Sequence, residues 1–367
     1  MNYPLLPPSA LLAAILVIIP LPWHWRARNI PTLSLMGWSF FLNIFYAVNI
    51  IVWNGNILDW APVYCDITTK FRVGAQFAIP AAVFCVCRSL ESIASNRAVY
   101  IDRATKQRWM IFDCVMCFLL PCVFMALHYI VQGHRYDIVE DFGCQAATYN
   151  SIPGFFIVFV PSLILAVLAM GFAGAAFYHF FRHRLAFSQH LANKSSGLTT
   201  NRYLRLMGMA VVVIIWNTSL NVYNLALNAS FEVRPWTSWA DVHSNWNRAD
   251  KYPTALLSES YIQNELLYWW AIPVSSYIMF FFFGLGEEAR KEYRKVYMWI
   301  RSRVFKLQDR PSASQSLPTY SVRLPFAQKS AMSTTTIVDS DKTSFASPTS
   351  RFHPSTLPST PSLVALP

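Results

Sequence analysis

The sequence contains little charge for its length. Of its 367 residues, 13% are charged, whereas 54% are hydrophobic and 16% are aromatic. Soluble domains carry roughly 25% charged residues, so an ordinary globular protein is excluded. The formal net charge of +11 could suggest nucleic acid, but the basic residues flank apolar stretches and form no stripe on a soluble fold. We therefore expect a membrane protein that contacts membrane lipids and has no nucleic-acid partner.

Motifs for catalysis and cofactor binding are also missing. The sequence has no His-Glu-x-x-His pair, no nucleophile elbow and no glycine-rich phosphate loop. The last apolar stretch, residues 264–286, lacks lysine, which excludes a retinal Schiff base there. Ionisable residues lie near the ends of the stretches, at Arg88, Glu91, Asp113 and Glu265, whereas proton relays need charge within the membrane. We predict no enzyme, no cofactor and no metal site; a transporter or membrane-embedded enzyme is the alternative.

Seven apolar stretches are each long enough to cross a membrane. A transmembrane helix needs about 20 mostly apolar residues, and we place the spans near residues 5–23, 32–53, 73–95, 109–131, 152–181, 206–228 and 264–286. The first lacks the basic start and the cleavage site of a signal peptide, so we expect it to be retained. The third is the weakest because polar residues leave it a short apolar centre, and a re-entrant segment is the alternative.

Basic residues concentrate in every second connection between these spans. They include Arg97, Arg103, Lys106, Arg108, Arg202 and Arg205, and further lysines and arginines follow the seventh span. A bias of Lys and Arg over short loops sets membrane topology. The amino terminus is therefore predicted outside and the residues after the last span in the cytoplasm. The predicted fold is all-α, a seven-transmembrane helix bundle.

Two cysteines stand apart from the other five. Five fall inside the spans, where a free thiol acts as a small apolar residue, and Cys65 and Cys144 lie in outer connections. That side of the membrane is oxidising, which favours a disulfide between them. It would tie the second outer loop to the top of the third helix. Two free thiols are the alternative, because sequence does not show that the sulfurs lie within bonding reach.

The last outer connection is rich in aromatic residues. Trp236, Trp239 and His243 follow one another closely, with Pro235 before them. Tryptophans at a membrane boundary commonly serve as interfacial anchors. The sharper interpretation is a recognition lid for an apolar or lipidated ligand, because rigid aromatic side chains are typical of binding hot spots.

Amides and prolines interrupt the apolar spans. Asn217, Asn221 and Asn224 are spaced so that they share one helical face. Interhelical hydrogen bonding is the favoured role for such a row, and ligand contact is the alternative. Pro80 and Pro273 each remove one backbone hydrogen bond and are candidate hinges or static kinks.

The segment after the last span divides into two parts. Residues 287–307 place basic and apolar side chains on separate faces, which predicts an amphipathic helix on the cytoplasmic leaflet. Residues 308–367 are rich in serine, threonine and proline, without apolar periodicity, and are predicted to be a disordered tail. The seven-helix domain then comprises residues 1–286.

Short motifs occur in order along the chain between about residues 5 and 300. They include Leu21-Pro22-Trp23-His24-Trp25, Cys65-Asp66-Ile67, Gly133-His134-Arg135-Tyr136-Asp137, Pro235-Trp236 with Ser238-Trp239, and Glu288-Ala289 with Tyr293. Through this combination the chain resembles the fungal mating-pheromone receptors that recognise lipidated a-factor-like peptides, class D G-protein-coupled receptors with seven helices. It departs from that pattern at Tyr64, where tryptophan is expected. Motifs of the rhodopsin-like receptors are absent.

The resemblance implies a plasma-membrane receptor that binds a farnesylated peptide pheromone and signals through a heterotrimeric G protein to trigger mating responses. Our leading hypothesis is that the lipid enters between helices while the peptide contacts Asp66, Lys70, Arg72, Asp137, Glu140, Trp236, Trp239 and His243. The basic residues Arg97, Arg103, Lys106, Arg108, Arg202 and Arg205 are then the candidate G-protein contacts. The identity of the pheromone, the residues that set specificity and a homodimeric state stay open.

Overall fold

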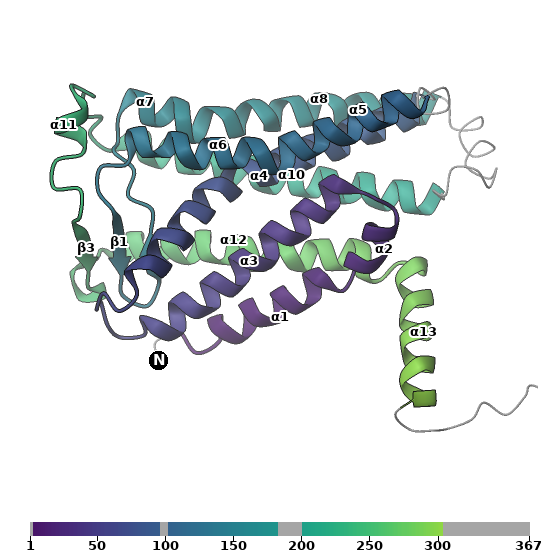
Figure 1. Cartoon of the computed structure of the whole chain (residues 1–367), viewed down its shortest axis with the longest axis horizontal. Coiled ribbons are helices and arrows are strands. Elements are labelled where there is room, and N and C mark those ends of the chain that lie inside the picture. Colours follow the sequence, from purple (N-terminus) through teal and green to yellow (C-terminus); the bar gives the residue numbers. More distant parts are fainter. Residues whose placement is uncertain (1–2, 96–101, 183–199, 304–367) are drawn as a thin grey trace, which may run out of the picture. The chain divides into compact units, whose positions relative to one another are not determined.

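The computed structural model describes residues 3–95, 102–182 and 200–303. Within them, seven helical segments are long and apolar enough to cross a membrane (Figure 1). They comprise Leu6–Arg26, Ile30–Val52, Pro62–Ala94, Arg103–Val131, Ile152–Arg182, Tyr203–Ser230 and Glu259–Gly284. The predicted seven-helix bundle is confirmed. The predicted tail and part of the connection that holds Arg97 lie outside the described residues.

The first two spans form a helical hairpin. The first consists of α1 (Leu6–Ile18) and α2 (Leu21–Arg26), which are separated where Pro20 caps α2. The second is α3 (Ile30–Val52), whose first turn is capped because the Asn29 side chain accepts a hydrogen bond from the Thr32 backbone nitrogen. Both α1 and α3 also pack against the last span, which closes this side of the bundle.

The third span, α4 (Pro62–Ala94), is the most buried of the seven and packs against α3, α6, α8 and α10. The sequence prediction started this span at residue 73, eleven residues too late, and a re-entrant segment is wrong. The cause is that Asp66, Lys70 and Arg72 are polar but have partners on neighbouring segments, so the helix extends through them. Pro62 at its first position suits a helix start.

The fourth and fifth spans each contain a turn of π-helix beside a proline. The fourth consists of α5 (Arg103–Cys114), the π-helical turn η2 (Val115–Leu119), α6 (Leu120–Leu127) and η3 (His128–Val131). The fifth consists of α7 (Ile152–Gly154), the π-helical turn η4 (Phe155–Phe159) and α8 (Val160–Arg182). Such turns are often found where a proline interrupts the hydrogen-bond ladder.

Two carbonyl groups that prolines release are satisfied by neighbouring helices. Pro121 has no N–H to donate to the Cys117 carbonyl, which instead accepts from Ser34 Oγ at 3.3 Å and Trp38 Nε1 at 3.2 Å, both on α3. Pro80 likewise releases the Gln76 carbonyl, which accepts from Ser162 Oγ on α8 at 2.9 Å. Because lipid offers no donors, these side chains replace the missing helical hydrogen bonds.

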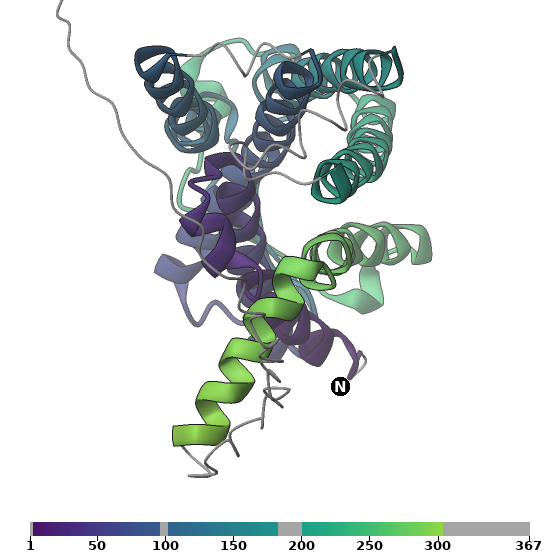
Figure 2. The ribbon, with the colours of Figure 1, turned by 90° about the vertical axis from the view of Figure 1, so that its right-hand side faces the viewer.

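The last three helices are α10 (Thr200–Ser230), α12 (Glu259–Gly284) and α13 (Glu287–Arg303). Figure 2 looks along the helices from the end that carries α13. Pro273 lies within α12, which continues through it. α13 begins directly after α12, and its Glu292 pairs with Arg26 of α2 at 2.8 Å.

A three-stranded sheet covers one end of the bundle, so the chain is not entirely α-helical. β1 (Tyr136–Val139) pairs antiparallel with β2 (Gly143–Gln145) and parallel with β3 (Ala249–Tyr252). The short helices α11 (Trp239–Val242) and η5 (Thr254–Leu256) flank β3 along the chain. The sheet therefore joins the connection before α7 to the connection before α12. We call this the sheet end and the other end, where α13 lies, the opposite end (Figure 1).

We expect Ser162→Ala to destabilise the bundle, because it leaves the Gln76 carbonyl buried without its donor. An unpaired buried polar group costs about 1–3 kcal/mol, so thermal unfolding of the purified protein in detergent should shift clearly downward. Ser275→Ala is the matched control, because the Ser275 hydroxyl bonds to a carbonyl of its own helix. Equal shifts for the two variants would contradict the bridging role.

Candidate functional site

A cavity of about 650 Å³ lies among the helices beneath the sheet. Its walls come from α3, α4, η4, α10 and α12, and strands β1 and β2 contribute to it from the sheet end. The positions farthest from the sheet are mostly apolar, among them Ile79, Phe159 and Ile272, and they also include Asn217 of α10. Its charged lining residues within the described chain, Arg72, Asp137 and Glu265, lie toward the sheet. The cavity therefore combines a charged rim with a largely apolar floor.

A polar chain crosses this rim from α4 to α12. An Arg72 guanidinium nitrogen donates to Gln145 Oε1, and Gln145 Nε2 donates to Glu265 Oε2 at 3.3 Å. The Arg72 guanidinium also lies 5.4 Å from the centre of the Tyr46 ring. Sequence reasoning proposed Arg72 and Asp137 for this site and missed Gln145 and Glu265. The position of Gln145 directly after Cys144 was the available signal.

The asparagines of α10 line the same cavity. Asn217 Nδ2 donates to the Val213 carbonyl and Asn221 Nδ2 to the Asn217 carbonyl, both at 2.9 Å and both within α10. The favoured prediction of interhelical hydrogen bonds is therefore wrong for these two residues, which face the cavity. Asn43 of α3 does bond between helices, because its Nδ2 donates to Ser276 Oγ of α12 at 2.8 Å.

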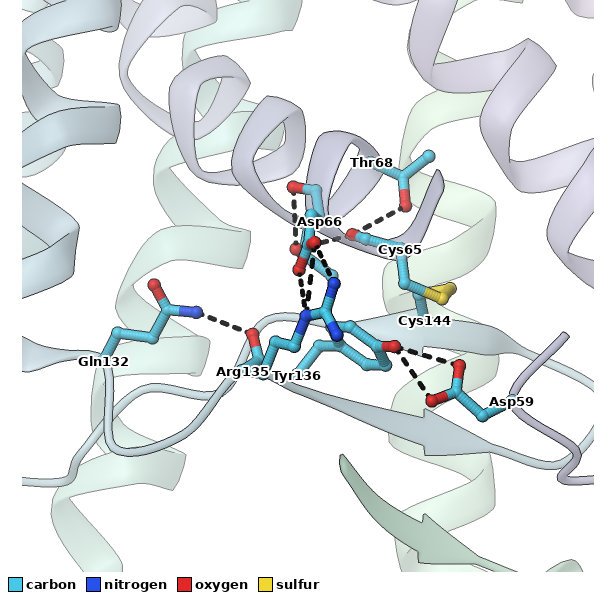
Figure 3. Close-up of polar contacts among 9 residues, drawn as sticks. Asp59, Cys65, Asp66, Thr68, Gln132, Arg135, Tyr136 and Cys144 are labelled. Carbon is cyan, nitrogen blue, oxygen red and sulfur yellow. Dashed lines mark hydrogen bonds and ion pairs between the residues drawn. A yellow bond between two sulfur atoms is a disulfide. The ribbon is translucent and has the colours of Figure 1, made fainter. Parts of the chain in front are cut away.

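A disulfide and an ion pair hold the sheet to the start of α4 (Figure 3). Cys65 of α4 is bonded to Cys144 of β2, with Cα atoms 5.3 Å apart. One residue further along α4, the Asp66 carboxylate accepts three hydrogen bonds from Arg135, from Nε at 2.9 and 3.2 Å and from a terminal nitrogen at 2.6 Å. The hydrogen bond to Asp66 raises the pKa of Arg135. Asp66 therefore acts as a loop anchor in this structure.

Tyr136 extends this anchor toward the first connection at the sheet end. Its side chain is fully buried, and its hydroxyl donates to the Asp59 carboxylate at 2.9 Å (Figure 3). Burial, and then the bond to Asp59, raise the pKa of Tyr136 above its usual value. The tyrosine therefore stays neutral and keeps donating throughout the physiological pH range.

Two other residues predicted to bind ligand also have partners within the loops. Lys70 Nζ lies 2.5 Å from Gln132 Oε1 and 3.2 Å from His128 Nδ1. Glu140 Oε2 accepts from the Thr254 backbone nitrogen at 2.7 Å and from its hydroxyl at 2.8 Å. Glu140 thereby fixes the turn that follows β3.

An aromatic cluster closes over the same end. The Trp239 and His243 rings stack with centroids 4.0 Å apart, and both also approach Tyr129. His243 Nε2 lies 2.8 Å from the Tyr129 carbonyl, and Trp236 Nε1 donates to the Ile130 carbonyl at 3.2 Å. This arrangement brings together the three aromatic residues predicted to form a lid, and it joins them to the end of the fourth span.

A second cavity, of about 510 Å³, lies between the aromatic loop and the connection before α7. It shares Thr148, Asn228 and Phe231 with the first cavity. The two spaces therefore adjoin, and together they lead from the loops toward the centre of the bundle.

His134, Asp137 and Asp250 place three atoms capable of binding a cation within 4.8 Å of one another. Arg248 lies among them: its Nε is 2.8 Å from an Asp250 oxygen and a terminal nitrogen is 3.2 Å from His134 Nδ1. The Arg248 guanidinium supplies positive charge to this cluster and occupies the Nδ1 atom of His134. The cluster thus serves to join β1 to β3.

The opposite end holds the basic residues predicted to contact a G protein. Arg103, Lys106 and Arg108 are exposed in the first turns of α5, and Arg205 is half-buried in α10. Arg202 belongs to α10, but its side chain is outside the described part, as is Arg97 altogether. Arg88 of α4 pairs with Asp113 of α5 at 2.8 Å, so these two charges tie neighbouring helices together.

The fold and the cavity define a multi-pass membrane protein with seven spans. At one end it has a cavity with charged and apolar walls beneath a sheet that a disulfide fixes to α4. The chain belongs to the STE3 family, described as pheromone A receptor, whose model matches residues 5–303. It is 47% identical to the Pheromone B beta 1 receptor of Schizophyllum commune over 80% of this chain and 54% of that protein. It is 26% identical to the Pheromone a factor receptor of Saccharomyces cerevisiae (strain ATCC 204508 / S288c), over 78% of this chain and 60% of that protein. The chain spans about half the length of the Schizophyllum receptors it matches.

We expect the Cys65–Cys144 bond to stabilise the sheet end as a single unit. Cys65→Ser and Cys144→Ser should each lower stability by about 2–5 kcal/mol, and the double variant should lose no more than either single one. Thermal unfolding in detergent with and without a reductant measures this. Cys122→Ser, which removes a free thiol, is the control. Additive losses would show that the two cysteines act separately.

Proposed function

We propose that the chain is a G-protein-coupled receptor for a lipidated peptide pheromone. The single observation that carries this is the cavity with a charged rim and a largely apolar floor, in a chain of the pheromone A receptor family. Such a space suits a ligand with a peptide part and an apolar anchor. We infer that the anchor is a farnesyl group and that the response is mating.

The sheet end is the extracellular end in this proposal. Disulfides form in oxidising compartments, and Cys65–Cys144 lies at that end. The exposed basic residues of α5 lie at the opposite end, as the positive-inside rule expects for cytoplasm. The receptor then spans the plasma membrane with its amino terminus outside.

The predicted ligand residues fall into three groups. Arg72 and Asp137 line the main cavity and are the direct contacts we propose. Asp66, Lys70 and Glu140 bond to other residues at the sheet end, and Trp236, Trp239 and His243 form the aromatic cover. We propose that Asp66, Lys70 and Glu140 shape the entrance. We also propose that Trp239, with 48% of its surface exposed, contacts the ligand as it enters.

On the cytoplasmic side, we propose that a heterotrimeric G protein docks on the opposite end. The exposed basic residues of α5 and Arg205 are the candidate contacts, with Arg97 and Arg202 nearby in sequence. We propose that α13 rests on the inner leaflet, since Val296, Tyr297 and Met298 are exposed apolar residues on a helix rich in basic residues. Residues 308–367 remain a predicted disordered tail.

The proposal is tested by expressing the chain in cells that carry a G-protein reporter and applying a library of farnesylated peptides. At least one peptide should activate the reporter, and its unfarnesylated form should be at least about tenfold weaker, because burying apolar surface contributes much of the affinity. A receptor that reaches the surface but responds to none of them would overturn the proposal.

Two tryptophan variants separate the aromatic cover from general surface effects. Trp239→Ala should raise the concentration needed for half-maximal response, whereas Trp60→Ala, a similarly exposed tryptophan in another connection at the sheet end, is the control. Surface expression is measured alongside. A dose–response curve like that of wild type for Trp239→Ala would show that Trp239 serves as an interfacial anchor and does not contact the ligand.

We expect charge reversal at Arg103 and Lys106 to weaken G-protein coupling without loss of peptide binding. Both side chains are exposed and make no contact with the cavity, so the reversal acts on a docking surface. Reporter output should fall about tenfold or more, while surface binding of a labelled farnesylated peptide is retained. Reversal at Lys251, an exposed basic residue of β3 that lines neither cavity, is the control for net charge. Unchanged output would exclude this surface.

A further inference from the structure

Gln145 occupies an unusual position in the main cavity. It is the last residue of β2 and directly follows Cys144, whose disulfide fixes the strand to α4. Successive side chains of a strand point to opposite faces. Cys144 is fully buried against α4, whereas Gln145 is half-buried and lines the cavity. The disulfide thereby positions one carboxamide at the charged rim.

The Gln145 carboxamide forms a hydrogen-bonded bridge between Arg72 and Glu265. Its oxygen accepts from Arg72 of α4 and its nitrogen donates to Glu265 of α12 at 3.3 Å. Arg72 offers only donors, and a carboxyl oxygen of Glu265 acts as an acceptor toward Gln145. The group between them must therefore present an acceptor on one side and a donor on the other, which is what an amide does.

All three residues are accessible from the cavity, so this contact can be exchanged. Each of them lines the cavity and keeps part of its surface exposed. A ligand that displaced the carboxamide without matching its bonds would leave a guanidinium and a carboxylate poorly satisfied, at a large cost. Displacement is favourable only for a ligand that supplies the same pair of groups.

We propose that Gln145 is a built-in stand-in for the ligand, and that an amide group of the bound peptide replaces it between Arg72 and Glu265. The amide accepts from Arg72 through its oxygen and donates to Glu265 through its nitrogen. This inference rests on the proposed function, because it names the chemical group that the same cavity recognises. It also makes Gln145 and Glu265 determinants of specificity.

The exchange links ligand binding to the positions of two helices. In the structure, the Gln145 side chain of β2 connects Arg72 of α4 to Glu265 of α12. When the peptide amide replaces Gln145 between Arg72 and Glu265, these two residues are no longer linked through β2. α4 and α12 are then held by the ligand instead, and a ligand shifts a conformational equilibrium only through such differential contacts.

The first test uses Gln145→Ala in the reporter cells, with the most potent farnesylated peptide from the library. Removing the competing carboxamide should lower the half-maximal concentration about threefold to tenfold, the range expected for one hydrogen-bonded amide. Gln263→Ala, at an exposed glutamine of α12 outside the cavity, should leave it unchanged. An unchanged or raised value for Gln145→Ala would overturn the inference.

The second test locates the amide on the peptide. Each backbone N–H of that peptide is methylated in turn, and each side-chain carboxamide is replaced by an apolar group of similar size. One change should cost about tenfold or more in wild type, as a hydrogen bond to a charged group predicts. In Glu265→Met, N-methylation at the same position should cost less than about twofold, since the partner of the N–H is already gone, whereas replacing a carboxamide should keep only the part of its loss that comes from Arg72. A methylated position identifies a backbone amide, and a replaced carboxamide identifies a side chain.

Glu259→Met is the matched control for this cycle. Glu259 is an exposed glutamate in the first turn of the same helix and does not line the cavity. Its variant should keep the full loss seen in wild type. If a loss persists undiminished in Glu265→Met, the inference fails while the receptor function stands. If wild type ignores every peptide, both fail together.

Discussion

The bundle depends on finding hydrogen-bond donors for backbone carbonyls in a setting where the solvent offers none. Pro80 and Pro121 each release one carbonyl, and side chains from other helices satisfy them. Ser162 thereby joins α8 to α4, and Ser34 with Trp38 joins α3 to the fourth span. Because an unsatisfied carbonyl in lipid is so costly, these bonds fix how the helices sit around α4. Of the segments that these bonds join, α3, α4 and the fifth span contribute to the walls of the main cavity.

The sheet end meets the same requirement in a different way. Its connections lie outside the helices, where the backbone needs partners of its own. β1 supplies them to β2 on one side and to β3 on the other, while the disulfide and the Asp66–Arg135 pair fasten the sheet to α4. Partly exposed ion pairs contribute little stability on their own, typically about 0–1 kcal/mol. The pair therefore sets the orientation of the loop, and the covalent bond provides the stronger constraint.

Hydropathy predicted the number of spans and most of their positions, since each is a long apolar run. The start of α4 was missed because Asp66, Lys70 and Arg72 resemble a loop in composition, and only the fold shows their partners. The sheet was missed because its strands have three or four residues, and β1 pairs with a strand more than a hundred residues away. Such short elements carry no readable period. The asparagines of α10 share a face as predicted, but their sequence spacing does not reveal whether that face meets a helix or a cavity.

In the proposed receptor, different charged residues hold the loops and face the cavity, so the sheet end can stay rigid while contacts in the cavity change. Asp66, Lys70 and Glu140 form bonds that hold the loops in place. A ligand that bound to them would have to break these bonds and would disorganise the loops around the entrance. Within the described part of the chain, Gln145 carries the hydrogen bonds that link Arg72 to Glu265, and in our proposal this side chain turns aside while β2 stays bonded to α4 through Cys144. A contact between α4 and α12 can thus change while the cover remains in place. The disulfide makes this possible, because it separates the stability of the sheet from the state of the cavity beneath it.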